Sequence, residues 1–225
     1  MNRSLPLSDR EAAGRLLAAA LTDFDHQPDV IVLALPRGGV PVAAEIARAL
    51  QVRLDLMLVR KLGVPGYEEL AMGAIASGGV RVMNEEVVRQ INIPPSAVEA
   101  AVRREGQELQ RREKAYRDNR PALDVKGRTV LLVDDGLATG ATMRAAVTAL
   151  RRQHPRRIVI AVPTAAPDTC EEFRAEVDDI VCAITPTAFY AVGAWYEQFP
   201  QNTDEEVQQL LGAAHRVLKK TGDPS

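Results

Sequence analysis

Short uninterrupted apolar runs alternate along this chain with segments whose apolar positions recur at helical spacing. Residues 30–35 form such a run, which predicts a strand covered on both faces. Residues 40–50 follow it with the spacing of an amphipathic helix. Strands alternating with helices predict an α/β fold, with an open, mostly parallel, twisted sheet and helices on both faces. The further predicted strands are residues 53–59, 128–133, 158–162 and 180–184, and the further predicted helices are 8–21, 143–152, 167–176 and 203–218.

Two of these helices have capping residues at their predicted starts. Ser8 is placed to cap the first helix, with Glu11 three residues on to complete a capping box. Thr203 precedes three acidic residues and is placed to cap the last helix. The final segment is therefore expected to close the domain as a helix.

The middle of the chain interrupts the alternation. Residues 61–79 are rich in glycine, which predicts a mobile loop with a short strand near 72–76 that forms a hairpin with residues 80–83. Two adjacent prolines then stop the chain, and Ser96 can cap a long helix to Asp118. The mixed charges of that helix favour a solvated face stabilised by i,i+4 pairs. A surface for a partner or a nucleic acid is the alternative.

Composition narrows the class of protein. The chain has 225 residues, 46% of them hydrophobic, and a formal net charge of −2. This length suits one domain over residues 1–225, and the charge provides no general attraction to nucleic acid or to a membrane. Cys170 and Cys182 lack metal-ligand spacing, so we expect two free core thiols. Without a signal-peptide pattern or an apolar run of membrane-spanning length, a cytoplasmic protein is expected.

The most informative stretch is residues 130–143, which read Val-Leu-Leu-Val-Asp-Asp-Gly-Leu-Ala-Thr-Gly-Ala-Thr-Met. An apolar run leads to two adjacent carboxylates, and a turn rich in Gly and Thr then opens a helix. The N–H groups and the dipole at a helix N-terminus favour a phosphate. Asp134 and Asp135 can accept hydrogen bonds from vicinal sugar hydroxyls. The combination suits a ribose 5-phosphate, and the alternative is an ordinary strand-to-helix turn capped by Asp and Thr.

This stretch resembles the phosphoribosyl-pyrophosphate (PRPP) signature of the type I phosphoribosyltransferases. The resemblance implies the type I phosphoribosyltransferase fold, with a small C-terminal hood and an inserted long helix. It implies that Asp134 and Asp135 bind the ribose hydroxyls and meet a metal ion only indirectly, through those hydroxyls or through water. The residues that it assigns to the 5-phosphate are Ala138, Thr139, Gly140, Ala141 and Thr142.

Two other segments resemble parts of the same family. Arg37, Gly38 and Gly39 follow the first core strand, where the family has its pyrophosphate loop. Arg60 and Lys61 occupy the place of the Arg-Lys pair that leads into the catalytic loop of the adenine and orotate members. Taken without the resemblance, these are a Gly-Gly turn and two exposed basic residues at a strand end. In open parallel sheets the ligand lies beyond the carboxyl ends of the strands, so we expect the three loops to converge.

One position departs from the 6-oxopurine enzymes. Those enzymes have a proton-handling aspartate just before the Thr-Gly, whereas this chain has Ala138. The departure argues against a usual hypoxanthine or guanine enzyme and fits members that take their acid or base from the mobile loop. Glu68 and Glu69 lie in that segment, and Glu69 is the candidate with Arg60 and Lys61 for a catalytic role. Solvated loop carboxylates are the alternative.

Aromatic side chains gather in the C-terminal part of the chain. Rings in residues 185–201 could stack on a planar base as the family's hood does, or pack the last helix onto the sheet. The three histidines form no metal or nucleophile motif, so solvated or capping roles are expected. The rings are Phe189, Tyr190, Trp195, Tyr196 and Phe199, and the histidines are His26, His154 and His215.

The resemblance implies a Mg²⁺-dependent transferase that moves phosphoribosyl from PRPP to a nucleobase-like acceptor and releases pyrophosphate. Residues 35–42, 134–143 and 189–199 also resemble a group of small bacterial predicted phosphoribosyltransferases. We expect a homodimer with a loop, hairpin and long-helix insertion at 61–120 and a hood at 185–225. A non-catalytic PRPP or nucleotide regulator, or a hydrolase of a phosphoribosyl compound, remains the alternative.

Overall fold

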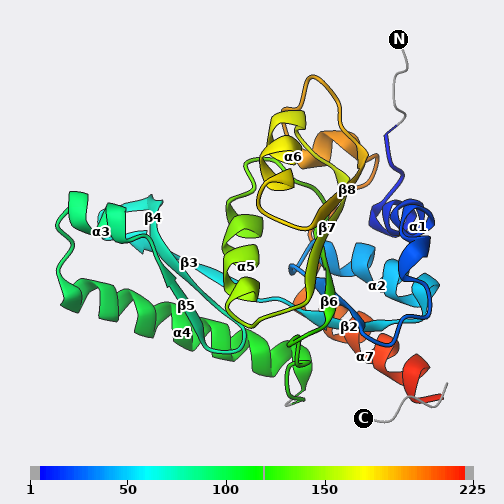
Figure 1. The fold of residues 1–225 in the computed structure, drawn as a ribbon, viewed down its shortest axis with the longest axis horizontal. Coiled ribbons are helices and arrows are strands. Elements are labelled where there is room, and N and C mark those ends of the chain that lie inside the picture. The colour runs from blue at the N-terminus through cyan, green and yellow to red at the C-terminus, as the bar shows by residue number, and fades with distance from the viewer. Residues whose placement is uncertain (1–5, 119, 221–225) are drawn as a thin grey trace.

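A five-stranded parallel sheet forms the centre of the molecule (Figure 1). The computed structural model describes residues 6–118 and 120–220. The strand order is β2-β1-β6-β7-β8, and each neighbouring pair is parallel, which confirms the predicted fold class. The strands are β1 (Val30–Ala34), β2 (Arg53–Leu56), β6 (Thr129–Val133), β7 (Arg157–Thr164) and β8 (Asp179–Ile184).

Helices cover both faces of this sheet (Figure 1). They are α1 (Arg10–Ala20), α2 (Gly39–Leu50), α5 (Ala141–Arg151), α6 (Pro167–Arg174) and α7 (Asp204–Lys220), with short 3-10 turns at Thr22–Phe24 and Val192–Trp195. Asp9 rather than Ser8 caps α1, because its side chain accepts a hydrogen bond from Ala12 N at 2.7 Å, so the Ser8 prediction is wrong. Thr203 caps α7 as predicted, since its Oγ1 accepts from Glu206 N at 3.1 Å.

Alternate residues of β1 enter two separate hydrophobic cores. Val30, Val32 and Ala34 belong to the core that they share with α1, α2 and α7. Ile31 and Leu33 belong to the core formed with α5 and α6. Because successive side chains of a strand point to opposite faces, an uninterrupted apolar run is what a doubly covered strand requires. The sequence pattern and the layered fold therefore have the same cause.

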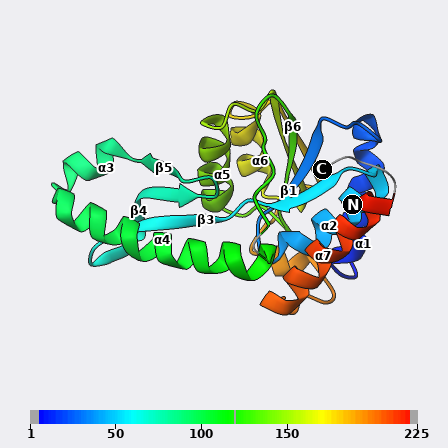
Figure 2. The ribbon, with the colours of Figure 1, turned by 90° about the horizontal axis from the view of Figure 1, so that it is seen from below.

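A second, antiparallel sheet and a long helix form an arm that extends away from the parallel sheet (Figures 1 and 2). The arm contains β3 (Val59–Val64), β4 (Tyr67–Ala76), β5 (Val80–Met83), α3 (Glu85–Gln90) and α4 (Pro95–Arg117). The predicted hairpin of residues 72–76 with 80–83 is confirmed by the pairing of β4 with β5. The remaining predictions for this region need three corrections.

The predicted strand at residues 53–59 is two strands in different sheets, because β2 ends at Leu56 and β3 begins at Val59. The predicted loop at residues 61–79 is also wrong, since β3 and β4 pair there as an antiparallel hairpin with register shifts near Gly63. At the start of α4 the capping position is Pro94 and not Ser96. Helix α3 was not predicted at all.

Ion pairs stabilise the exposed side of α4, as its charge pattern indicates. Glu108 accepts hydrogen bonds at 2.7 Å from both Arg111 and Arg112, which lowers the pKa of Glu108 to about 2. The end of the helix is different, because the nearly buried Arg117 donates to Asp55 of β2 at 2.9 Å. That buried contact ties the arm to the parallel sheet.

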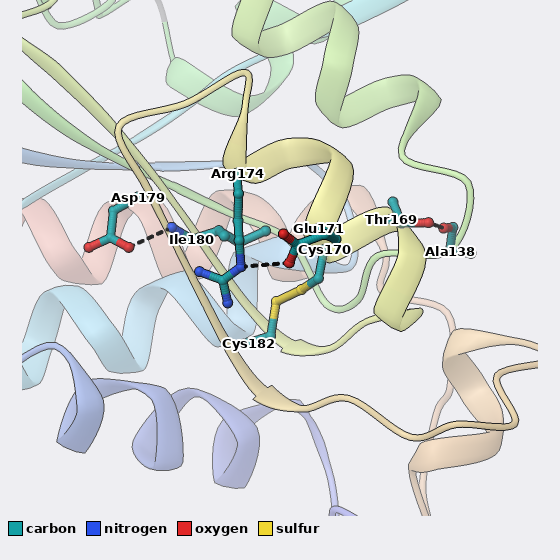
Figure 3. The surroundings of a disulfide bond; sticks show 8 residues. All are labelled: Ala138, Thr169, Cys170, Glu171, Arg174, Asp179, Ile180 and Cys182. Atoms are coloured by element: carbon teal, nitrogen blue, oxygen red, sulfur yellow. Dashed lines mark hydrogen bonds and ion pairs between the residues drawn. A yellow bond between two sulfur atoms is a disulfide. The ribbon is translucent and has the colours of Figure 1, made fainter.

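The two cysteines form a disulfide, so the expectation of free thiols is wrong (Figure 3). Cys170 lies in α6 and Cys182 in β8, with their Cα atoms 7.4 Å apart. Their separation of 12 positions conveys no proximity by itself; the packing of α6 on the edge strand of the sheet brings them together. In the described residues we find no helix with the length and apolar character needed to cross a membrane.

Candidate functional site

The strand order places the candidate loops at one point of the sheet. From β1 the chain crosses to β2 on one side, and it later returns to β6 on the other side of β1. Ligands of open α/β sheets bind beyond the carboxyl ends of the strands at such a reversal. The loops that follow β1 and β6 contain the Arg37–Gly38–Gly39 segment and the acidic pair, respectively.

Two glycines allow these loops to touch. A Cβ atom on Gly38 would lie 2.0 Å from Asp135 Oδ2, and one on Gly39 would lie 2.7 Å from Val133 O and 2.8 Å from Asp134 Cα. No side chain fits in either place. The predicted convergence of these two segments is therefore confirmed, and the need for glycine comes from close approach rather than from backbone conformation. The Pro36–Arg37 peptide bond in this loop is cis.

The Thr-rich loop lies at the N-terminus of α5, as expected. Gly140 is the residue before the helix and has a φ of +71°, a conformation that favours glycine. A Cβ there would also lie 2.6 Å from Phe173 Cε2 of α6. Thr169 Oγ1, from the same helix, donates to Ala138 O at 2.7 Å (Figure 3). Helix α6 thus supports the loop from behind, while the remaining loop residues are exposed: Ala138, Thr139, Ala141 and Thr142.

The acidic pair is held in a largely desolvated position at the end of β6. Burial raises the pKa of Asp134 well above its ordinary value, and the neighbouring charge of Asp135 raises it further. Burial also raises the pKa of Asp135, although hydrogen bonds from Arg10 act in the opposite direction. The backbone N–H of Asp135 donates to Asp134 Oδ1 at 2.9 Å, which orients the Asp134 carboxyl group.

Arg10 is the main residue of the site that the sequence did not reveal. Its Nε and Nη2 atoms lie 2.9 Å and 2.8 Å from Asp135 Oδ2, across 125 positions of sequence. The Arg10 side chain is only 8% exposed, so this is a buried ion pair rather than a surface contact. No local motif marks an arginine in the first turn of an N-terminal helix as part of a site.

Two of the predicted cationic residues, Arg37 and Arg60, are engaged in ion pairs. Arg60 donates to Glu105 of α4 at 2.9 Å from Nε and 2.6 Å from Nη2. Burial would raise the pKa of Glu105, but the hydrogen bonds from Arg60 and Arg104 outweigh it and lower the pKa. Pro36, Arg60 and Thr142 line one small cleft of about 20 Å³, so all three predicted loops meet there.

Arg37 lies against the start of α7. Its Nη1 atom is 3.5 Å from Asp204 Oδ1, which also accepts a hydrogen bond from the Tyr116 hydroxyl at 2.7 Å. Burial, together with that bond to Asp204, raises the pKa of Tyr116 to about 12. The first loop of the site is thus linked to both α4 and α7.

Positions 61, 68 and 69 lie farther out on the arm. Lys61 pairs with Ala74 in the β3–β4 ladder and is exposed. Glu68 Oε2 is 3.9 Å from Arg104 Nη2, a contact between exposed side chains. The backbone of Glu69 belongs to β4, and its side chain lies outside the described part of the structure.

Comparison with known proteins decides the family. The family model for the phosphoribosyl transferase domain matches residues 62–197. The chain belongs to the phosphoribosyl transferase family. The match spans α5 and the acidic pair, and the parallel sheet with the site at its reversal is the type I phosphoribosyltransferase fold that the sequence predicted.

Relatives of this phosphoribosyl transferase chain support the assignment. It is 45% identical over 214 residues to proteins of two Mycobacterium tuberculosis strains, CDC 1551 and H37Rv, whose names describe them provisionally as phosphoribosyl transferases. The alignment covers 95% of this chain and 48% of each relative, so the chain spans about half the length of these curated relatives. The crystal structure of TT1426 from Thermus thermophilus is 43% identical, with a TM-score of 0.81 over 92% of this chain and 98% of that one.

The aromatic side chains in residues 185–201 of this family member have different surroundings. Tyr196 is buried, and its hydroxyl donates to Asp135 O at 2.6 Å. Its ring packs on Phe199 with centroids 4.9 Å apart. Tyr190 is 89% exposed, while Phe189 and Trp195 are half-buried. Packing therefore accounts for Tyr196 and Phe199, and base stacking by the other rings stays a prediction.

The expected solvated role fits His26 and His154, which are exposed, whereas His215 is half-buried. His26 is exposed and pairs with Asp25 at 2.7 Å, and His215 Nδ1 is 2.8 Å from Leu211 O within α7. His154 lies in a turn with a positive φ. Among residues 6–118 and 120–220, no group of three or more His, Cys, Asp or Glu side chains could hold a metal ion.

Proposed function

We propose that the protein transfers the 5-phosphoribosyl group of PRPP to a nitrogenous base and releases pyrophosphate. The observation that supports this proposal is the close approach of Gly38 to the Asp135 carboxylate, because the segment that resembles the family's pyrophosphate loop lies beside the two carboxylates that would bind the ribose. The turn at the N-terminus of α5, where Thr139 is exposed and Gly140 is buried, would add a phosphate cradle.

Each part would act on a different group of PRPP. The N–H groups at the start of α5 would bind the 5-phosphate, and Asp134 and Asp135 would accept hydrogen bonds from the ribose hydroxyls. Arg37, with Arg60 and Lys61, would stabilise charge on the departing pyrophosphate. Such a reaction needs no protein nucleophile, since fixed charges and dipoles stabilise the positive charge that develops at C1.

A magnesium ion could bind at this site together with PRPP. Mg²⁺ is commonly bound through one or two carboxylates together with substrate phosphates rather than by an all-protein cage. The adjacent Asp134 and Asp135 carboxylates would contribute to that binding indirectly, through ribose hydroxyls or water. When bound, the ion would neutralise charge on the pyrophosphate group.

The acceptor base belongs to a class that needs no aspartate before the Thr-Gly turn. Ala138 has no ionisable side chain, and its carbonyl oxygen already accepts a hydrogen bond from Thr169. Proton transfer would therefore come from the arm, where Glu69 is the first candidate and Glu68 the second. Both lie on β4, the central strand of the arm sheet.

A base panel tests the proposal. The full chain is incubated with Mg²⁺, PRPP and one nucleobase at a time, and pyrophosphate release is followed. The matched control is the double variant Asp134→Asn/Asp135→Asn. Base-dependent release that the control lacks supports transfer. Release without a base would indicate hydrolysis, and tight PRPP binding without turnover would indicate a regulator; either would overturn the proposed reaction.

A further inference from the structure

The Arg10 side chain fills the space between the acidic pair and the C-terminal segment. It donates to Asp135 Oδ2 from Nε, and its Nη1 donates to Pro200 O at 2.7 Å. Its guanidinium carbon lies 3.8 Å from the centroid of the Phe199 ring, within cation–π range. Asp135, Pro200 and Phe199 therefore each contact a different part of the guanidinium group.

Close contacts with α2 and with the C-terminal segment fix the position of α1. A Cβ on Gly14 would lie 2.6 Å from Val42 O, so α1 approaches α2 as closely as a helix without that side chain permits. Just before α1, Leu7 N donates to Trp195 O at 2.9 Å and Glu197 N donates to Leu7 O at 2.8 Å. The N-terminal segment is thus joined to the C-terminal one, and the first turn of α1 is held over Asp135.

Asp135 needs such a partner because of its surroundings. Its side chain is 15% exposed, and the carboxyl group of Asp134 is the next along the chain. Two neighbouring desolvated carboxylates repel each other, so without a cationic partner the two side chains would tend to turn apart. Both Arg10 contacts end on Oδ2, which orients the group and leaves Oδ1 without an Arg10 contact.

We propose that Arg10 is a positioning residue for the ribose half of the site: it holds the Asp135 carboxylate in one rotamer to accept hydrogen bonds from the sugar diol. This inference rests on the proposed function. The 5-phosphate loop at Ala138–Thr142 has its own supports in Thr169 and Phe173, and none of the Arg10 contacts above involves it. Loss of Arg10 should therefore weaken binding of the sugar and spare binding of the phosphate.

The test compares two ligands that differ by the sugar. Ribose 5-phosphate and inorganic phosphate are titrated calorimetrically into the full chain as wild type, Arg10→Gln and Arg10→Lys. The matched control is Arg15→Gln, on the same helix, where the exposed Arg15 pairs with Glu45 at 3.6 Å. Arg10→Lys keeps the positive charge and one donor group, the ammonium. It replaces Arg10→Gln in the comparison if the Gln variant does not purify as folded protein.

We expect Arg10→Gln to weaken ribose 5-phosphate binding about tenfold or more, the loss typical of one charged hydrogen bond. Phosphate affinity should stay within about twofold of wild type, Arg10→Lys should recover part of the sugar affinity, and Arg15→Gln should match wild type. Equal losses for both ligands, or no loss for the sugar phosphate, would overturn the role of Arg10. Failure of the wild type to bind PRPP or ribose 5-phosphate would instead overturn the proposed function, and this inference with it.

Discussion

Replacing Gly38 by alanine tests the contact that joins the two halves of the site. Gly38 has a φ of −62° and a ψ of −36°, so alanine adopts its backbone conformation without strain. The added Cβ, however, would lie 2.0 Å from Asp135 Oδ2, a distance at which the carboxylate must move. The substitution therefore acts through one side chain of the site and through no change of backbone.

The magnitude follows from the bonds that this movement breaks. Displacing Oδ2 breaks the one hydrogen bond that it accepts from Arg10 Nε at 2.9 Å, and with it the ion-pair contact to Nη2 at 2.8 Å. Losing a charged hydrogen bond costs about 1.5–3 kcal/mol. Replacing glycine in a compatible conformation returns about 0.4–1 kcal/mol by restricting the unfolded chain. The free energy of unfolding of Gly38→Ala should fall by about 1–2 kcal/mol, and its PRPP affinity should fall about tenfold or more.

Two assays separate these effects. Urea denaturation gives the free energy of unfolding, and calorimetric titration gives the PRPP affinity. Gly106→Ala is the matched control, because the nearest atom to its Cβ is Ile75 Cδ1 at 4.0 Å and the residue lies within α4. That variant should be more stable by about 0.5–1 kcal/mol and bind PRPP as wild type does. Wild-type PRPP affinity in a folded Gly38→Ala protein would refute the reasoning.

Three further substitutions test the loop before α5, the disulfide and the acidic pair. Gly140→Ala forces a φ of +71° on alanine and a clash with Phe173. Calorimetric titration should therefore show weaker phosphate binding, and the free energy of unfolding should fall by at least about 1–2 kcal/mol. Unchanged values would contradict the support of this loop by α6. Cys170→Ser should lose up to about 3 kcal/mol relative to oxidised wild type, a difference that dithiothreitol should abolish if the disulfide with Cys182 is its cause. Asp134→Asn should raise the free energy of unfolding at neutral pH. Folding raises the pKa of the Asp134 carboxyl group, so its ionised form destabilises the folded state, and asparagine removes that cost. That gain should vanish in denaturation curves measured below the unfolded pKa of about 3.9, and a gain that persists there would contradict the assignment.

The apolar pattern was sufficient to predict the parallel sheet, because strands covered on both faces and amphipathic helices differ in period. Residues 30–35 and 128–133 were recognised as strands that coincide with β1 and β6 to within one residue at each end. The acidic pair and the Thr-rich loop were recognisable because their chemistry is local. A strand, two carboxylates and a phosphate turn are all adjacent in sequence.

The arm could not be predicted in the same way. Residues 61–79 are rich in glycine, which is typical of loops, yet β3 and β4 form a hairpin there because Leu62 and Met72 are buried against α4 and the rest of the core. The strand predicted at residues 53–59 is also two strands that belong to different sheets, which the apolar pattern does not show. Its hydrophobicity is continuous, whereas its hydrogen-bond partners change from β1 to β4.

Long-range contacts account for the remaining omissions. Arg10 meets Asp135 across 125 positions, and Cys170 meets Cys182 only because α6 packs on the edge of the sheet. Neither pairing leaves a periodic or spaced signal. Tyr196 was noticed as part of an aromatic cluster, but its hydrogen bond to Asp135 O depends on how the C-terminal segment folds over the site.

The most direct test of the central claim is the binding of PRPP itself. Calorimetric titration of PRPP with Mg²⁺ into the full chain is compared with the same titration into Asp134→Asn/Asp135→Asn, with circular dichroism to show that both proteins are folded. We predict saturable binding to the wild type and a loss of at least about a hundredfold in the double variant, as expected when two charged hydrogen-bond acceptors are removed. Equal affinity in the two proteins, or no binding to the wild type, would contradict the assignment of this site to PRPP.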